Sequence, residues 1–401
     1  MARKTDLSDL ACFGRAPAAA RPLHVNRPNA GDRQVFGDLV DGIWDSRWFT
    51  NAGPLVDRFE AELAAFLGVD HVVVMASGTA ALDVLIRALD LEGEVILPSY
   101  TFISSPHVLM RAGLRPVFCD IEPAHWNIDP AACEAVITNQ SSAILATHVW
   151  GRAADIETLQ GIATRHGLAL IFDTAHGFGC THKGRRLGRF GDAEVFSFQA
   201  NKAFHCGEGG AVSTNDAALA ARLRRERSFG FVAFDEVAGT GTNAKLPELS
   251  AALGLTNLAA FPDHVARARA VWQRYADNLA GLPGFALQAY GGNETYNHQY
   301  VAGLIAPDTA LSRDQIIDIL HAEGVLARRY FYPGCHGMKP YDSLYPGLKQ
   351  SLTVTEDISK RVLVLPGGAA ISDDEIDLVC DLMRLIMDQA PAIATRLRSP
   401  A

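Results

Sequence analysis

Short apolar runs alternate with amphipathic stretches along the chain between residues 54 and 225. Apolar runs bounded by glycine or polar positions predict strands, and apolar positions three and four residues apart predict helices. The predicted strands are Val72–Met75, Glu94–Leu97, Pro116–Cys119, Ala143–Thr147, Leu168–Phe172, Val195–Phe198 and Ala211–Ser213. The predicted helices are Pro54–Leu67, Ala80–Leu89, Ile103–Ala112, Pro130–Ile137, Ile156–His166 and Ala217–Arg225. Strands that are apolar on both faces need helices on both sides, so we predict an α/β fold with a mostly parallel central sheet covered by helices.

The pattern changes near residue 260. A long helical stretch, Asp263–Leu282, leads to one strand, Tyr300–Ile305, and to two helices, Arg313–Glu323 and Asp373–Met387. These elements predict a smaller C-terminal α+β domain. The expected organisation is an N-terminal arm at residues 1–50, a large ligand-binding domain at 51–260, a small domain at 261–390 and a flexible tail at 391–401.

Composition narrows the possible functions. The chain has 401 residues, 48% of them hydrophobic and 20% charged, with a formal net charge of −9. This acidic balance argues against nucleic-acid or anionic-membrane binding. No apolar run reaches membrane-spanning length and the first residues do not form a secretory signal, so we expect a cytoplasmic protein. The seven cysteines form no C-x-x-C pair and the histidines match no common zinc spacing, so neither a disulfide framework nor a metal site is expected.

Lys202 is the strongest candidate for a chemical role. It follows the apolar segment Phe196–Phe198 and precedes a glycine-rich turn, and Asp173 ends an apolar run upstream. A pyridine cofactor needs an amine to form an imine, a carboxylate beside its ring nitrogen and donors for its phosphate. We therefore predict a site for pyridoxal 5′-phosphate (PLP) in which Lys202 and Asp173 are catalytic. The alternative is a solvated surface lysine, against which its buried and glycine-lined surroundings count.

Other residues could complete such a site. Gly78 and Thr79 open a helix directly after a strand, where free N–H groups bind anions, and Ser197 could add a hydroxyl. The same segment could also be a simple helix cap. No Walker or dinucleotide glycine motif is present, which disfavours a nucleotide triphosphatase and a dehydrogenase.

Three further residues could contact the cofactor ring. Phe102 follows a strand at the same predicted sheet edge and could stack on the ring. His176 could bind the phenolic oxygen, and Ala175 could pack against the other face.

With these residues placed, the chain resembles the sugar-nucleotide aminotransferases, which are PLP enzymes with the aspartate-aminotransferase fold (fold type I). The resemblance extends from about Arg21 to Leu385. It rests on Trp48–Pro54, Ser77–Leu82, Pro98–Phe102, Asp173–His176, Phe196–Lys202, Glu208–Gly210, Gly241–Lys245, Ala251–Ala252 and Arg329–Pro333 with His336.

The resemblance implies specific roles. Lys202 would form the Schiff base, Asp173 would pair with the ring nitrogen and His176 would meet the phenolic oxygen. Family members are usually homodimers with shared sites, so Asn243 is expected to reach the phosphate of the neighbouring subunit. The resemblance also implies four substrate-binding residues, which are Lys245, Arg329, Tyr330 and His336. Lys245 occupies a position where many relatives carry arginine, and His176 one where many carry glutamine.

The resemblance is closest to enzymes that aminate C4 of dTDP-4-keto-6-deoxy-D-glucose, such as the enzyme of desosamine biosynthesis. The implied reaction is a ping-pong transamination from L-glutamate, with pyridoxamine 5′-phosphate carrying the amino group, to a 4-amino-4,6-dideoxy sugar. Three alternatives stay open: a 3-keto-sugar aminotransferase of the same family, a PLP-dependent deoxysugar dehydratase, which would carry histidine in place of Lys202, and a non-catalytic PLP-binding regulatory protein.

Overall fold

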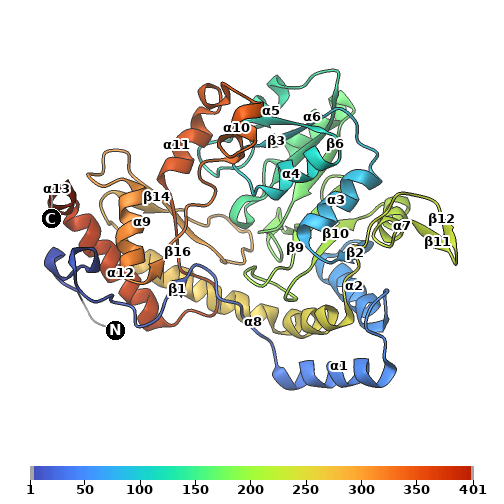
Figure 1. Cartoon of the computed structure of the whole chain (residues 1–401), viewed down its shortest axis with the longest axis horizontal. Helices are drawn as coiled ribbons and strands as arrows, with labels where there is room; N and C mark the ends of the chain where they lie inside the picture. Colours follow the sequence, from blue (N-terminus) through green and yellow to red (C-terminus); the bar gives the residue numbers. More distant parts are fainter. Residues whose placement is uncertain (1–3, 399–401) are drawn as a thin grey trace.

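The computed structural model describes residues 4–398 and confirms the predicted α/β fold (Figure 1). Its centre is a seven-stranded sheet in the order β2-β10-β9-β6-β5-β3-β4. β9, β6, β5, β3 and β4 pair in parallel, whereas β10 is antiparallel to both β9 and β2. The bounds are β2 His71–Met75, β3 Glu94–Pro98, β4 Arg115–Cys119, β5 Ser141–Thr147, β6 Ala169–Asp173, β9 Ala193–Ser197 and β10 Gly210–Thr214.

Helices cover both faces of this sheet, as the doubly apolar strands require. Val73 and Val212 belong to one hydrophobic cluster with α3, α4 and α7, whereas Val72 and Val74 point to the other face, against α2. A third cluster packs α6 beneath β5 and β6. The helix bounds are α2 Pro54–Leu67, α3 Gly78–Ala88, α4 Ser104–Arg111, α5 Pro130–Ala135, α6 Ile156–His166 and α7 Ala217–Glu226.

A second, antiparallel sheet forms the C-terminal region. It consists of β13 (Phe285–Leu287), β14 (Val301–Ile305) and β16 (Val362–Leu365), with β14 in the middle. Further elements of this region are α9 Arg313–Ala322, β15 Val325–Leu326, α10 Tyr341–Leu344, α11 Thr353–Arg361 and α12 Asp373–Asp388. We propose that the two sheets mark two domains.

One long helix, α8 (Glu248–Asn278), joins the two regions and crosses the predicted boundary at residue 260. It begins well before the predicted start at Asp263 and continues through Pro262. Its first half packs against α1 and α2, and its second half against α12. Tertiary packing on both sides therefore maintains a helix that the internal proline would be expected to end.

The N-terminal region is more ordered than the predicted arm. It contains α1 (Arg33–Ser46), capped by Asp32, and β1 (Leu23–His24), which pairs in parallel with β15. Before β1, the segment is fastened to the buried carboxylate of Glu323, which accepts hydrogen bonds from Lys4 Nζ and from the backbone N–H groups of Ala11 and Ala18.

The predicted flexible tail at 391–401 is wrong for residues 391–398. Ala390–Arg398 form a helix, α13, in which Ile393 and Ala394 are buried in the same hydrophobic cluster as α12. Burial of these apolar side chains orders a segment that its chain-end position alone suggested would fray. Residues 399–401 lie outside the described part of the chain.

Two hairpins extend from the large sheet. β7 (Thr181–His182) pairs with β8 (Arg185–Arg186), and β11 (Phe231–Ala233) pairs with β12 (Glu236–Val237). The second hairpin lies at the edge of the molecule in Figure 1, and its Phe234 is fully exposed. Over residues 4–398, no helix has both the length and the apolar character needed to cross a bilayer.

The start of α3 packs closely against β10 where Gly78 meets Gly210. A Cβ on Gly210 would lie 2.4 Å from the backbone nitrogen of Gly78. We expect Gly210→Ala to lower the free energy of unfolding by about 1–3 kcal/mol, because backbone on both sides must shift. Gly42→Ala in α1, where the added methyl group meets open space, is the matched control and should be neutral or slightly stabilising. Urea denaturation of both variants measures the difference; equal stabilities would contradict it.

Candidate active site

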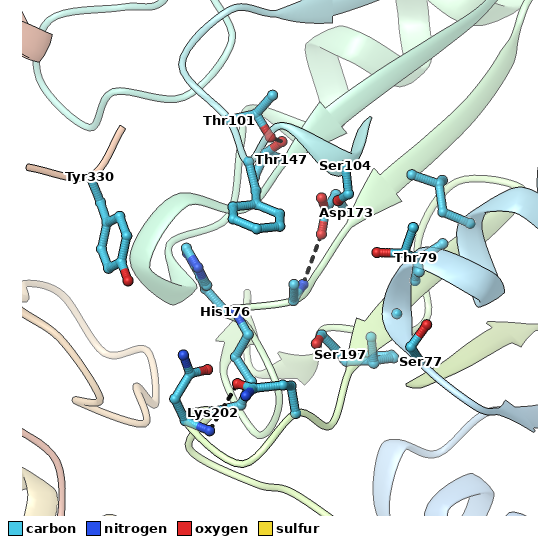
Figure 2. A pocket seen from close by; sticks show the side chains of 18 of the residues that line it. Ser77, Thr79, Thr101, Ser104, Thr147, Asp173, His176, Ser197, Lys202 and Tyr330 are labelled. Atoms are coloured by element: carbon cyan, nitrogen blue, oxygen red, sulfur yellow. Dashed lines mark hydrogen bonds between the residues drawn. The ribbon is translucent and has the colours of Figure 1, made fainter. Parts of the chain in front are cut away.

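A cavity of about 360 Å³ opens at the carboxyl edge of the parallel strands (Figure 2). Its volume is within the range of small-molecule sites, and its position is the usual ligand position in open α/β sheets. Residues at the ends of several strands or just beyond them line it, together with Tyr300, Tyr330 and Phe331 from the C-terminal region. The structure brings together nine of the predicted residues here: Gly78, Thr79, Phe102, Asp173, Ala175, His176, Ser197, Lys202 and Tyr330.

Asp173 lies at the end of β6, with only 8% of its surface exposed. Ser105 Oγ donates a hydrogen bond to Asp173 Oδ2 at 3.2 Å, and the Ala175 N–H donates to Oδ1 at 3.1 Å. Burial raises the pKa of Asp173, while these hydrogen bonds and the charge of Lys202 act in the opposite direction. A protonated pyridine nitrogen beside this carboxylate would favour its charged form. The pattern of the sequence did not reveal Ser105, which lies in the first turn of α4.

Lys202 lies in the turn that follows β9. Burial lowers the pKa of its amine to about 8, against the opposing attraction of Asp173. An amine with this pKa has a far larger neutral fraction near physiological pH than an ordinary lysine, and the neutral form is the nucleophile and the proton acceptor. The two groups on which the predicted chemistry depends therefore share one cavity and influence each other's charge.

The start of α3 forms an anion cradle. Ser77 caps the helix, its Oγ accepting from the Ala80 N–H at 3.1 Å, so the N–H groups of Gly78 and Thr79 have no acceptor within the helix. In Figure 2, Ser77, Thr79 and Ser197 gather on one side of the pocket. A Cβ on Gly78 would lie 2.9 Å from Ser197 Cβ, so glycine is required for this close approach. The helix dipole adds to the attraction for a phosphate.

His176 belongs to an aromatic stack that forms one wall. Its ring is parallel to Trp150 with centroids 5.1 Å apart, and to Phe331 at 5.8 Å. The backbone N–H of Trp150 donates to His176 Nδ1 at 3.4 Å, which places the ring proton on Nε2. Burial lowers the pKa of His176, so the ring is neutral. A neutral ring with its proton on Nε2 can donate a hydrogen bond to a phenolate oxygen.

The other four predicted residues lie outside this cavity. Asn243 is exposed, beside the β11–β12 hairpin, and Lys245 Nζ lies 4.6 Å from the centroid of the Phe229 ring. Arg329 borders an adjoining hollow of about 470 Å³ and pairs with Asp314 at 3.2 Å.

His336 has no free ring nitrogen for a substrate. It is buried, Ser99 Oγ lies 2.6 Å from Nδ1, and Glu356 Oε1 lies 3.0 Å from Nε2. The structure therefore gives His336 an internal bridging position instead of the direct substrate contact that the resemblance implied.

The residues that line the cavity fit a bound PLP. The Lys202 amine, whose pKa is lowered, can bind the aldehyde of the cofactor. The buried carboxylate that Ser105 holds can pair with the ring nitrogen, and the helix start at Gly78 allows the phosphate to approach closely. No three His, Cys, Asp or Glu side chains among residues 4–398 are grouped as metal ligands.

Comparison with known proteins agrees with this geometry. The model of the DegT/DnrJ/EryC1/StrS aminotransferase family matches residues 32–384. The chain belongs to this family. It is a sugar aminotransferase, and the family to which it belongs is PLP-dependent.

Two curated relatives and one solved structure illustrate the likeness. The dTDP-4-amino-4,6-dideoxy-D-glucose transaminase of Shigella dysenteriae is 33% identical over 366 residues, covering 91% of this chain and 99% of that protein. GDP-perosamine synthase of Vibrio cholerae is 30% identical over 372 residues, covering 90% and 98%. The crystal structure of DesI with its TDP-sugar product is 45% identical, covers 98% of this chain and 100% of that chain, and superposes with a TM-score of 0.94.

The pKa of Lys202 gives a pH prediction for this aminotransferase. Since only the neutral amine attacks an aldehyde, covalent attachment of PLP to the apo-enzyme should accelerate as the pH rises through about 8. Asp173 raises the pKa of Lys202, so Asp173→Asn should move the midpoint to lower pH. Stopped-flow absorbance across the pH range measures both midpoints. A midpoint near 10.5, the ordinary value for lysine, would contradict the burial of this amine.

Proposed function

We propose that this aminotransferase transfers the amino group of L-glutamate to C4 of dTDP-4-keto-6-deoxy-D-glucose, giving the 4-amino-4,6-dideoxy sugar. The observation that carries the transamination is the joint presence of Lys202, Asp173 and the Gly78 cradle in one cavity. The sugar and nucleotide are supported by the relatives: DesI, with 45% identity, was solved with a TDP-sugar product, and the Shigella enzyme is named for a dTDP-linked 4-amino sugar.

The proposed roles of the residues follow from their chemistry. When bound, PLP withdraws electrons from the carbon that loses a proton. Lys202 would hold the cofactor between turnovers. Once the amino donor has displaced it, its free Nζ would take the proton from the donor's α-carbon and pass it to the cofactor carbon that had formed the imine. In the second half-reaction the same amine would take a proton back from that carbon and pass it to the sugar carbon that receives the amino group. Asp173 keeps the ring nitrogen protonated, and His176 Nε2 donates to the phenolic oxygen. Gly78, Thr79 and Ser197 hold the phosphate.

A homodimer with shared sites would complete this arrangement. We propose that Asn243 reaches the phosphate bound by the neighbouring subunit, and that Lys245, Arg329 and Tyr330 contact the nucleotide sugar. Exposed apolar side chains near Asn243 and on α1 support an interface between copies. They include Phe229, Phe231, Phe234, Val35 and Trp44.

Replacement of the lysine tests the chemistry. Lys202→Ala should reduce transamination by at least about a thousandfold, because both the attachment point and the proton carrier are lost. Lys183→Ala, which removes an exposed lysine paired with Glu157, is the control and should keep wild-type activity. Borohydride reduction followed by peptide mass spectrometry should find the phosphopyridoxyl group on Lys202 in the wild type and in the control. Attachment to another lysine would refute the assignment.

A substrate panel tests the specificity. The wild-type enzyme, loaded with amino groups from glutamate, is offered dTDP-linked 4-keto and 3-keto sugars and a GDP-linked 4-keto sugar. We expect the dTDP-4-keto-6-deoxy sugar to give the highest kcat/KM, with NMR locating the new amine at C4. Faster turnover of the GDP-linked substrate would instead favour the activity named for the GDP-perosamine synthases, whose identity to this chain is 30–33%.

A further inference from the structure

Glu194 is a buried carboxyl group in the central sheet, close to the cofactor cavity but outside it. It lies on β9 opposite Phe172 of β6 and has no exposed surface. Over residues 4–398, the only basic side chain within ion-pair distance is the imidazole of His148, whose Nε2 is 3.7 Å from Glu194 Oε2. Burying a carboxyl group without arginine or lysine costs several kcal/mol, and an apolar residue would fill this interior position at less cost. The position therefore calls for a reason other than stability.

The contacts of Glu194 lead to the segment that carries Asp173. Thr174 Oγ1 donates to Glu194 Oε2 at 2.5 Å, and the Phe190 N–H donates to Oε1 at 2.9 Å. The Ala154 N–H donates to His148 Nδ1 at 3.0 Å, so the proton of the His148 ring is on Nε2 and faces the carboxyl group. At 3.7 Å this nitrogen is too far from Glu194 Oε2 for a hydrogen bond, and it has no hydrogen-bond partner in the described structure.

Thr174 and His148 are also the residues whose backbones hold Asp173 in place. The His148 N–H donates to the Asp173 carbonyl at 3.0 Å, and the Thr174 N–H donates to the Val195 carbonyl at 2.8 Å. The Thr174 carbonyl accepts from Gly177 at 2.8 Å and so closes the loop. This loop carries three of the cavity-lining residues: Asp173, Ala175 and His176.

We propose that Glu194 is a positioning residue of the cofactor site. Its carboxyl group binds the Thr174 hydroxyl and faces the His148 imidazole, and the backbones of these two residues hold the loop from Asp173 to His176 against the cofactor ring. This inference rests on the proposed function, in which that loop contacts PLP. A carboxyl group can accept from the Thr174 hydroxyl and from the Phe190 N–H at once, which an apolar side chain in the same position cannot do.

The protonation states of Glu194 and His148 do not favour an ion pair between them. Burial lowers the pKa of His148 to about 3, with a further small effect from His182, so its ring is neutral. Burial raises the pKa of Glu194 to about 7, against hydrogen bonds from Thr174, Phe190, Gly188 and Arg189.

Glu194→Leu tests the proposal in the full-length apo-enzyme. We expect its dissociation constant for PLP to rise about tenfold or more, the scale on which hydrogen-bonded supporting residues act. We expect kcat to fall with little change in the KM of either substrate, and the urea midpoint to fall, because the Thr174 hydroxyl and the Phe190 N–H lose their acceptor. Glu194→Gln, which keeps the shape and one acceptor, should rescue most of the PLP affinity.

A second buried glutamate on the same sheet provides the matched control. Glu94 accepts from the hydroxyl of Thr138 at 2.6 Å and from Arg115 at 2.8 Å, but it begins β3, at the opposite edge from the cavity. Glu94→Leu should leave the PLP dissociation constant unchanged.

Two outcomes would overturn the proposal. One is PLP affinity within twofold of wild type in Glu194→Leu, and the other is an equal loss of affinity in Glu94→Leu. If Glu194→Leu does not fold, Thr174→Val takes its place, with the same expected loss of PLP affinity. The wild-type enzyme separates the positioning role of Glu194 from the proposed function. If the wild type aminates the sugar and PLP binding is unaltered in Glu194→Leu, only the positioning role is rejected.

Discussion

The site depends on keeping one lysine and one carboxylate out of water in the same cavity. Desolvation opposes the charged form of Lys202 and of Asp173, while each group favours the charge of the other. For Lys202 desolvation is the larger effect, so its pKa falls to about 8 despite the nearby carboxylate. In an open, wet cleft the amine would keep the ordinary lysine pKa and would be almost fully protonated at neutral pH. The enclosure of the cavity is therefore part of its chemistry.

The topology of the sheet provides this enclosure. Parallel strands end at the same edge, so Thr101, Thr147, Asp173 and Ser197 meet there although they are far apart in the sequence. The antiparallel pairing of β10 with β2 and β9 then brings the start of α3 against Ser197. That approach is possible because Gly78 on α3 and Gly210 on β10 have no side chains.

The sequence alone predicted the strands of the large sheet and several residues of the cavity, because both depend on local pattern. Apolar runs mark buried strands, and Lys202, Asp173 and Gly78 lie at strand ends or in glycine-rich turns. Features that depend on distant contacts were missed or misplaced. The helix predicted from Asp263 in fact begins at Glu248 and continues through Pro262, and burial of Ile393 orders a segment that was predicted to be flexible.

The role of His336 could not be predicted from the sequence either, because it too depends on distant contacts. Its motif could be recognised in the sequence, but only the fold shows that Ser99 and Glu356 occupy both of its ring nitrogens. The supporting residues Ser105 and Glu194 left no signal in the pattern, since each resembles an ordinary helix or strand position. A residue that acts by positioning another side chain can be recognised only once the structure shows which residues it contacts.

The C-terminal region lines the cavity with Tyr300, Tyr330 and Phe331. This wall of the cavity is hydrogen-bonded to the large sheet at several points. Tyr100 Oη donates to the Tyr330 carbonyl at 2.7 Å, the Cys335 N–H donates to the Ser99 carbonyl at 2.8 Å, and His336 bridges the same strand end to α11. Asp120 accepts from the first N–H groups of α11, which adds a further link between the two sheets. Because these bonds are buried or nearly so, displacing the wall would leave several polar groups unpaired, at about 1–3 kcal/mol each. The position of the residues that the C-terminal region contributes to the cavity is thus set by the fold itself, so selectivity among ketosugars would depend on side chains at the cavity surface more than on movement of this region.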